Sequence, residues 1–279
     1  PGFAGQTSNS PALSTDPLSW PYSWPNRPSG WDNYWNGFHG RGITIADEET
    51  YFVMDDSQDR EWGFYPVTSD TFRRGLGLEV EVRGYTWTDT PAEDVMVWQF
   101  EIHNESDYDY QKVVMGIYLD PAIGGGDDSF DDIGTYLPNL DMVYFSDADG
   151  YGTPGNWHPV GMLAVKYLEM PGNAVDGIDN DSDGLIDESR DNGIDDDGDW
   201  DPFSDDVGMD GVSGTGDPGE NDGMPTNGEP NFDKTDKQEA DDIHINTVRL
   251  FPVHTYELWN EEENWQAFTS GIRDSVTGP

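Results

Sequence analysis

The residues best suited to chemistry are aspartates that recur at every second position of one short loop. Asp179, Asp181 and Asp183 occupy the first, third and fifth positions of a pattern typical of calcium loops, and Gly184 follows at the sixth. Carboxylates spaced in this way converge on one hard cation, and the glycine permits the sharp turn between them. The spacing therefore predicts a calcium site.

The end of this loop departs from the EF-hand pattern. An EF-hand places a bidentate Glu at its twelfth position, where this chain has Arg190. We therefore expect the backbone carbonyl of Leu185 to contribute, and Asp187 or Glu188 to complete the coordination shell. No helical pattern flanks the loop, so a true EF-hand is not expected.

The same pattern recurs 16 residues further on, which makes it a stronger signal than a single loop. The run Gly-Ile-Asp-x-Asp-x-Asp at residues 177–183 is repeated at residues 193–199, although Trp200 at the sixth position requires a different geometry. Smaller candidates, equally well interpreted as solvated turns, are residues 147–150 and the aspartates at 127, 128, 131 and 132. The predicted metal ligands of the main segment are Asp176, Asp179, Asp181, Asp183, Leu185, Asp187, Glu188, Asp195, Asp197, Asp199, Asp201, Asp205, Asp206, Asp217, Asp222 and Glu229.

The charge of the chain favours cations as partners. The formal net charge is −44, which repels nucleic acid and anionic membranes alike, and residues 176–242 hold 24 of the 57 acidic residues. Two carboxylates about 4 Å apart repel by roughly 4 kcal/mol at an effective dielectric constant near 20, so a metal-free loop would open. Calcium loops of extracellular modules have dissociation constants of about 0.1 to 1 mM, so we expect several Ca²⁺ ions and an extracellular or cell-surface location. The competing interpretation is a disordered acidic linker.

The elements that position these loops are predicted to be mainly β. Apolar and polar residues alternate at 76–83, 96–103 and 113–119, and further strands are expected at 142–145, 160–168 and 243–251. Short turns between such strands favour an antiparallel β-sandwich with the acidic segment as a long irregular insertion. Asn260, Glu263 and Gly271 supply the capping signals of one short C-terminal helix.

The chain is thus predicted to have four parts. They are an extended Trp/Pro-rich N-terminal arm (1–42), a β-sandwich (43–170), an Asp-rich calcium-binding insertion (171–242), and a returning strand with the C-terminal helix (243–279). The arm carries Trp20, Trp24, Trp31 and Trp35, which are too apolar to remain in water. We expect the arm to pack on its own domain or on a neighbouring subunit.

Signals of catalysis are weak, and we expect no enzyme. The five histidines lack zinc-protease spacing, there is no cysteine, and neither a Gly-x-Ser-x-Gly elbow nor a phosphate-binding loop occurs. His103 lies on a predicted strand and is expected to be a surface or otherwise satisfied residue. Acidic pairs and the 11 tryptophans leave one alternative, a carbohydrate-binding module or a glycoside hydrolase.

The order of several motifs resembles a known group of proteins. The Trp-Pro-rich arm, Tyr-Phe-Val-Met-Asp-Asp at 51–56, Gly-Leu-Gly-Leu-Glu-Val at 75–80, Asp120-Pro121, the run from Asp176, and Gly-Glu-Pro-Asn-Phe-Asp at 228–233 resemble large surface proteins exported through the type IX secretion system. The aspartate loops are similar to thrombospondin type 3 repeats, which implies calcium at Asp179, Asp181, Asp183 and Asp187, although the cysteines often found in those repeats are absent.

Together these observations predict an extracellular calcium-binding structural protein. We expect a self-assembling surface or filament subunit, or part of an adhesin. The arm could join copies head to tail, because a heterologous contact need not close into a ring. Surface glycans are a further expected partner, whereas nucleic acid is not expected. No run of 18 apolar residues occurs, so membrane insertion is not expected either.

Overall fold

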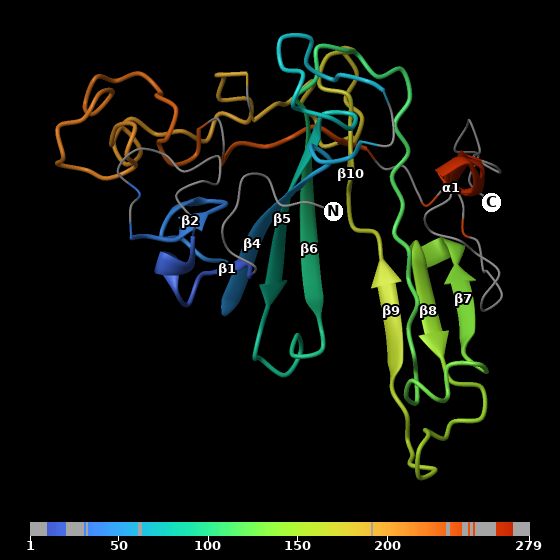
Figure 1. Cartoon of the computed structure of the whole chain (residues 1–279). Helices are drawn as coiled ribbons and strands as arrows, with labels where there is room; N and C mark the ends of the chain where they lie inside the picture. The colour runs from blue at the N-terminus through green and yellow to red at the C-terminus, as the bar shows by residue number, and fades with distance from the viewer. Residues whose placement is uncertain are drawn as a thin grey trace. The chain divides into compact units, whose positions relative to one another are not determined.

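The computed structural model shows a mainly β chain with several small antiparallel sheets and one short C-terminal helix (Figure 1). It describes residues 10–20, 31, 33–60, 63–190, 192–232, 235–241, 245, 248 and 261–269. This confirms the predicted mainly β class and the predicted helix. Within the described residues, no helix has the length and apolar character needed to cross a membrane.

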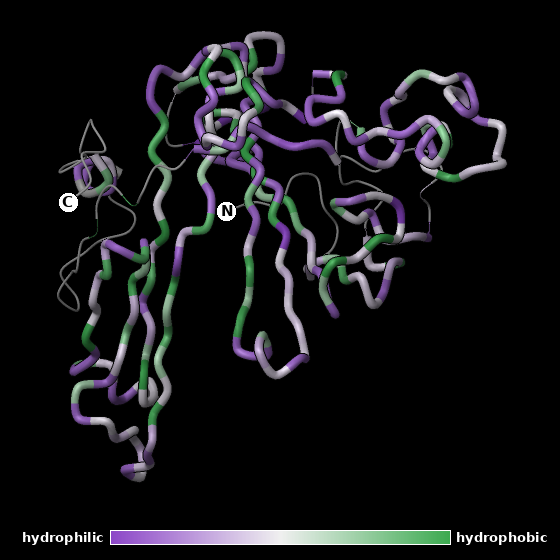
Figure 2. The backbone as a smooth tube through the Cα atoms, turned by 180° about the vertical axis from the view of Figure 1, so that it is seen from behind, coloured by the Kyte–Doolittle hydropathy of each residue, from purple (hydrophilic) through white to green (hydrophobic). Residues whose placement is uncertain are grey.

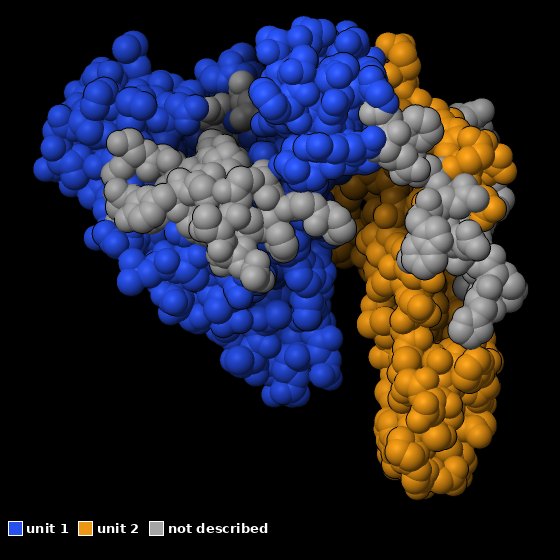
Figure 3. All heavy atoms as spheres, in the orientation of Figure 1, with its two compact units in different colours: residues 1–110, 185–238 blue, residues 111–184, 239–279 orange. Residues whose placement is uncertain are grey.

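The chain divides into two compact units, coloured separately in Figure 3. Unit 1 comprises residues 1–110 and 185–238, and unit 2 comprises residues 111–184 and 239–279. The boundary after residue 184 falls inside the first aspartate loop. The two copies of the loop therefore belong to different units.

Unit 1 is built on a four-stranded antiparallel sheet in the order β1-β4-β5-β6. Its strands are β1 (Ala12–Leu13), β4 (Glu48–Asp55), β5 (Leu78–Thr86) and β6 (Met96–Asn104), and the three long ones lie side by side in Figure 1. The last two form where the sequence predicts alternating strands at 76–83 and 96–103. Their register places Val82 opposite Phe100 and Glu81 opposite Glu101.

One face of this sheet is covered by the N-terminal segment. Trp20 stacks on Tyr51 with ring centroids 4.1 Å apart, and Trp35 meets Trp20 edge to face at 5.4 Å. These three rings, with Ala12 and Val53, form the buried core cluster. Trp20, Trp31 and Trp35 are thus buried within their own chain, while Trp24 lies outside the described residues.

The covered face is also rich in charged side chains. Glu49, Glu79, Glu81 and Arg83 are all buried there. On β6 the apolar residues lie on the opposite face, where Met96, Trp98, Phe100 and Ile102 are exposed. The alternation therefore predicts the strand but not which of its faces is the more buried.

The described residues of the N-terminal segment form only short regular elements. After β1 come a 3₁₀ turn, η1 (Pro17–Ser19), and a small hairpin of β2 (Asn36–Gly37) and β3 (Gly40–Arg41). Several arginines of unit 1 lie over aromatic rings: Arg190 is 3.7 Å from the Phe38 ring centroid and Arg41 is 3.8 Å from that of Tyr34. Such cation–π contacts attract the guanidinium groups to the aromatic rings of the same chain.

Unit 2 contains a three-stranded antiparallel sheet in the order β7-β8-β9. Its strands are β7 (Ile133–Leu137), β8 (Met142–Ser146) and β9 (Met162–Lys166), and the turn η2 (Pro138–Leu140) joins the first two. A short pair, β10 (Met170–Pro171) and β11 (Ala240–Asp241), brackets the acidic segment. The predicted strands at 142–145 and 160–168 are therefore confirmed.

The helix α1 (Glu261–Thr269) also belongs to unit 2. The position of α1 agrees with the sequence, whereas its predicted caps, Asn260 and Gly271, lie outside the described residues. Most of the predicted strand at 243–251 also lies outside them.

The predicted strand at 113–119 is wrong. Residues 111–120 carry no strand, and Val113, Met115 and Ile117 are exposed. Alternation indicates an extended backbone, but a strand also requires a neighbouring backbone with free N–H and C=O groups. Here the chain passes from unit 1 to unit 2 after residue 110, and the extended segment pairs with no strand of the described chain.

The acidic segment is coil held by its own side chains. Residues 172–190 and 192–232 carry no helix or strand. Figure 2 colours the chain by hydropathy, and hydrophilic stretches recur along this coil. Because regular backbone ladders are missing from these two ranges, side-chain contacts and isolated backbone turn bonds, such as that from the N–H of Met209 to the carbonyl of Pro218 at 3.1 Å, hold the coil.

Candidate metal centres of the acidic segment

The first aspartate loop is ordered by bonds from backbone N–H groups to carboxylates. The N–H of Asp183 donates to Asp181 Oδ1 at 3.0 Å, and that of Gly184 donates to Asp179 Oδ2 at 3.1 Å. Gly184 has φ +103°, a conformation that favours glycine, as the loop pattern predicts. Asp176 accepts from the N–H of Ile178 at 3.0 Å.

The second copy repeats several of these bonds at the offset of 16, although Asp195 accepts from the N–H groups of Gly198 and Asp199, whereas Asp179 accepts from that of Gly184. The N–H of Ile194 donates to Asn192 Oδ1 at 2.7 Å, and that of Asp199 donates to Asp197 Oδ1 at 3.2 Å. Asn173 and Ser189, also 16 apart, donate their N–H groups to Asn180 and Asp196 respectively, both at 2.9 Å. The sequence repeat is therefore a structural repeat.

Each copy also engages an acid from residues 236–239 that sequence analysis did not select. The N–H of Asn180 donates to Glu239 Oε1 at 2.9 Å, and the equivalent N–H of Asp196 donates to Asp236 Oδ2 at 2.8 Å. Glu239 is only 1% exposed and Asp236 only 5%. Buried carboxylates are costly unless donors or cations surround them, and in each copy a loop N–H group supplies one such donor. Nothing in their spacing distinguishes them, because they follow the loops by dozens of residues.

The carboxylates gather closely enough to share a cation in both copies. One oxygen from each of Asp179, Asp181 and Glu239 lies within 4.8 Å of the others, and Asp195, Asp197 and Asp199 form a second such group. Partial burial and the neighbouring carboxylate of Asp197 raise the pKa of Asp199 to about 6. Desolvation is the largest cause of this raised pKa and repulsion by the neighbouring carboxylates comes second, and a divalent cation would oppose both by stabilising the charged form of Asp199.

The remaining predicted ligands of the second half mainly organise the coil. Asp206 accepts from the N–H groups of Asp222 and Gly223 at 3.2 and 2.8 Å, and Asp217 accepts from that of Asp210 at 2.7 Å. Asp205 is buried and accepts from the N–H of Asp201 at 2.9 Å.

Glu229 joins three parts of this coil. Its carboxylate accepts from the N–H of Gly208 at 2.9 Å, from the indole Nε1 of Trp200 at 3.0 Å and from the N–H of Thr226 at 2.9 Å.

The end of the first loop, namely Leu185, Asp187 and Glu188, belongs to unit 1, whereas Asp179 to Gly184 belong to unit 2. Glu188 is buried.

The smaller candidate in unit 2 also brings acids together. Asp128, Asp131 and Asp147 each place an oxygen within 4.8 Å of the others. Burial raises the pKa of the adjacent Asp132, whose carboxylate accepts from the N–H of Ile123 at 3.0 Å. The cluster joins the loop at 123–132 to the turn that follows β8. Asp149 instead accepts from the N–H of Tyr151 at 2.8 Å, so its role there is a turn bond.

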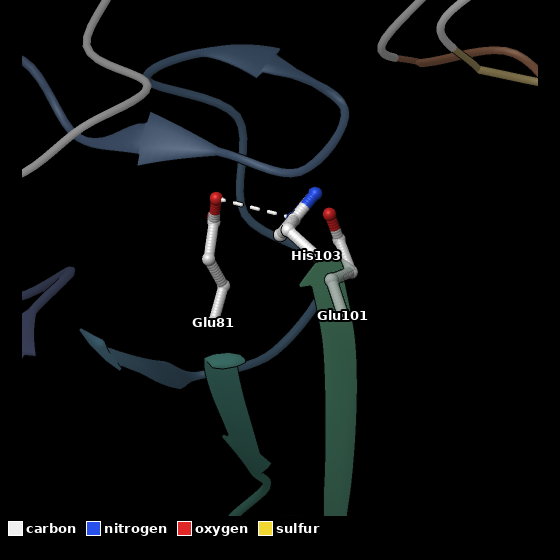
Figure 4. Close-up of side chains that lie close together, drawn as sticks. All are labelled: Glu81, Glu101 and His103. Carbon is white, nitrogen blue, oxygen red and sulfur yellow. Dashed lines mark ion pairs between the residues drawn. The ribbon is translucent and has the colours of Figure 1, made fainter. Parts of the chain in front are cut away.

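A separate group on the sheet of unit 1 joins two carboxylates and a histidine. Figure 4 shows Glu81 on β5 and Glu101 and His103 on β6, with the three side chains close together. Nε2 of His103 lies 3.5 Å from Glu81 Oε1. The sequence places Glu81 and Glu101 on predicted strands, but their meeting depends on the pairing register, which the sequence does not specify.

Comparisons with protein-family models, with curated proteins and with solved structures found no match for this chain. The assignment of function therefore rests on the chemistry of these clusters.

Proposed function

We propose that the chain is an extracellular calcium-binding structural protein, with no catalytic role, in which Ca²⁺ orders the acidic segment. One observation carries this proposal: two loops 16 residues apart make the same turn bonds, and each takes a buried acid from residues 236–239. A disordered acidic linker, the competing interpretation, has no reason to repeat such bonds.

Calcium suits these ligands better than other common ions do. Ca²⁺ takes six to eight oxygen ligands in flexible geometry, whereas Mg²⁺ requires a near-ideal octahedron and retains its waters. Asp179, Asp181 and Glu239 supply only oxygens from coil, as do Asp195, Asp197 and Asp199. At the millimolar calcium of an extracellular fluid such loops would be filled, which supports the proposed location.

The β-sandwich remains the proposed architecture beyond the observed sheets. The outer face of β6 exposes Met96, Trp98, Phe100 and Ile102, an apolar stripe that a second sheet would cover. The same stripe is a surface on which copies of the protein could associate.

Self-assembly through the N-terminal segment is part of the proposal. The segment supplies β1 to the edge of the sheet and Trp20 and Trp35 to the core. The same contacts made on another copy would link subunits head to tail without closing. The resemblance to exported surface proteins agrees with this role. Electron microscopy with calcium should then show polymers, and a strictly monomeric protein would point to a passive spacer in an adhesin.

Calcium calorimetry tests the two loops. We expect Asp236→Asn and Glu239→Gln to weaken calcium binding by about 10-fold or more each, because each substitution removes a carboxylate charge while keeping an oxygen for the loop N–H group. Glu93→Gln, an exposed acid between β5 and β6, is the matched control and should bind as the natural chain does. Unchanged calcium affinity in both loop variants would show that the carboxylates of Asp236 and Glu239 take no part in calcium binding. Binding to a glycan array that is the same with and without calcium would favour the carbohydrate-binding alternative.

Replacing Asp199 is expected to stabilise the calcium-free protein but to reduce the stabilisation that calcium gives. Because its pKa in the folded state is raised from 3.8 to about 6, the ionised carboxylate destabilises the calcium-free fold above pH 6, and this cost disappears as the pH falls toward 3.8. Asp199→Asn should therefore raise the melting temperature at pH 7.5 in chelator and reduce the gain from added calcium. Thermal melts at pH 7.5 and pH 4 measure both effects. A lower melting temperature in chelator would show that Asp199 is not a repelled carboxylate.

A further inference from the structure

We propose that Glu81, Glu101 and His103 form a site for a first-row transition ion of the Zn²⁺ class, distinct from the calcium loops. The site lies on one face of the sheet of unit 1, where each of the three side chains offers one ligand atom within 4.8 Å of the others. Glu81 comes from β5, and the other two come from alternate positions of β6 (Figure 4). An ion there would clip two neighbouring strands together.

The pairing register creates an electrostatic problem that a cation would solve. Glu81 and Glu101 are direct cross-strand partners, and like charges in that position destabilise a sheet. Moreover, the Glu81 side chain is only 7% exposed. Arg190 contacts Glu101 at 3.2 Å and offsets one of the two charges. A dication bound by both carboxylates would neutralise the pair.

The histidine indicates which class of ion would bind. Nε2 of His103 is buried, has no hydrogen bond with any described residue, and lies 3.5 Å from Glu81 Oε1. Imidazole with carboxylates suits Zn²⁺ and its neighbours, whereas Ca²⁺ prefers oxygen alone. Ligands of a tetrahedral Zn²⁺ are roughly 3.4 Å apart at metal–ligand distances near 2.1 Å, so small side-chain movements would complete the site. The His103 side chain is 38% exposed, which gives an ion a route from solvent.

A second layer of residues holds the first carboxylate in place. The Tyr51 hydroxyl donates to Glu81 Oε2 at 2.7 Å, leaving Oε1 directed at the histidine. The Tyr51 ring is itself fixed by stacking on Trp20. Hydrogen bonds of this kind orient ligands and tune metal affinity.

Cobalt titration of the full chain tests the site. Co²⁺ replaces Zn²⁺ and shows strong visible absorption when four-coordinate, and the titration is run in excess Ca²⁺ so that the oxygen-only loops are filled. We expect one equivalent of absorbing Co²⁺, displaced by Zn²⁺. His103→Gln and Glu81→Gln should weaken binding about 100-fold or more, beyond the roughly 10- to 100-fold expected for the outer residue in Tyr51→Phe. His158→Gln, at an exposed histidine of unit 2, is the matched control.

A second measurement does not depend on the variants folding. In the natural chain, Zn²⁺ should protect His103 from carbethoxylation, read by mass spectrometry, while His158 stays reactive. Equal modification of His103 with and without Zn²⁺, or Co²⁺ absorption unchanged in His103→Gln, would overturn the site. Neither result would bear on the calcium proposal, which is judged by calcium calorimetry.

Discussion

Removal of calcium is expected to lower the unfolding free energy by about 5 kcal/mol. At a free concentration 100 times the dissociation constant, which is roughly 10 to 100 mM for loops of this kind, each bound ion contributes about 2.7 kcal/mol, and the two repeated loops supply two sites. The loss should appear first in the coil at residues 172–190 and 192–232, because no backbone ladder holds it there. Calorimetry with calcium and with chelator measures the change, and limited proteolysis locates it.

Two controls separate binding from general screening. Magnesium at the same concentration should restore little stability, since it fits flexible oxygen loops poorly. Sodium chloride at matched ionic strength should restore still less if specific sites are responsible. Equal melting temperatures and equal protease resistance in calcium and in chelator would remove the basis of the proposed function.

The second large effect is expected in the core of unit 1. Trp35→Ala should destabilise the protein by about 3 to 5 kcal/mol, the usual cost of truncating a buried Trp. Trp35 is 2% exposed, contacts Trp20 edge to face, and donates from Nε1 to Glu49 Oε2 at 2.7 Å. Chemical denaturation in saturating calcium measures the loss without interference from the loops.

Two further substitutions separate the causes of the expected loss of stability in Trp35→Ala. Trp35→Phe keeps most of the volume but leaves buried Glu49 without its indole donor, so it should fall between Trp35→Ala and the natural chain. Phe72→Ala, at a side chain 89% exposed, should change stability by no more than about 0.5 kcal/mol. If Trp35→Ala resembled Phe72→Ala, the N-terminal segment would not be part of this core.

The sequence predicts the long strands and the aspartate loops because both depend on local periodicity. The alternation at 76–83 and 96–103 and the 16-residue repeat from residue 177 need no knowledge of distant contacts. The same local signal misled at 113–119, where the segment pairs with no strand among the residues that the structure describes. The alternation of side chains predicts an extended segment, but it does not predict which neighbouring strand that segment pairs with.

The residues that were missed all depend on distant contacts. Glu239 and Asp236 meet their loops only after a long stretch of coil has returned. Likewise, His103 and Glu81 come together through the register of β5 and β6 and not through any spacing typical of a metal site. The polar side of those strands is the more buried one, so hydropathy alone does not identify the face on which these residues meet.

The arginines laid over aromatic rings affect how the whole molecule meets its surroundings. Arg41 covers Tyr34, Arg190 covers Phe38, and Arg74 lies 4.1 Å from the Tyr65 centroid, so these three of the chain's 13 basic residues contact aromatic rings of the same chain. These contacts leave each guanidinium charged, but 57 acidic residues against 13 basic ones give the chain a formal net charge of −44. Anything approaching within a Debye length, about 8 Å at physiological ionic strength, therefore meets a polyanion. Two copies would repel each other on approach, and each divalent ion held by the proposed calcium loops would lower that repulsion.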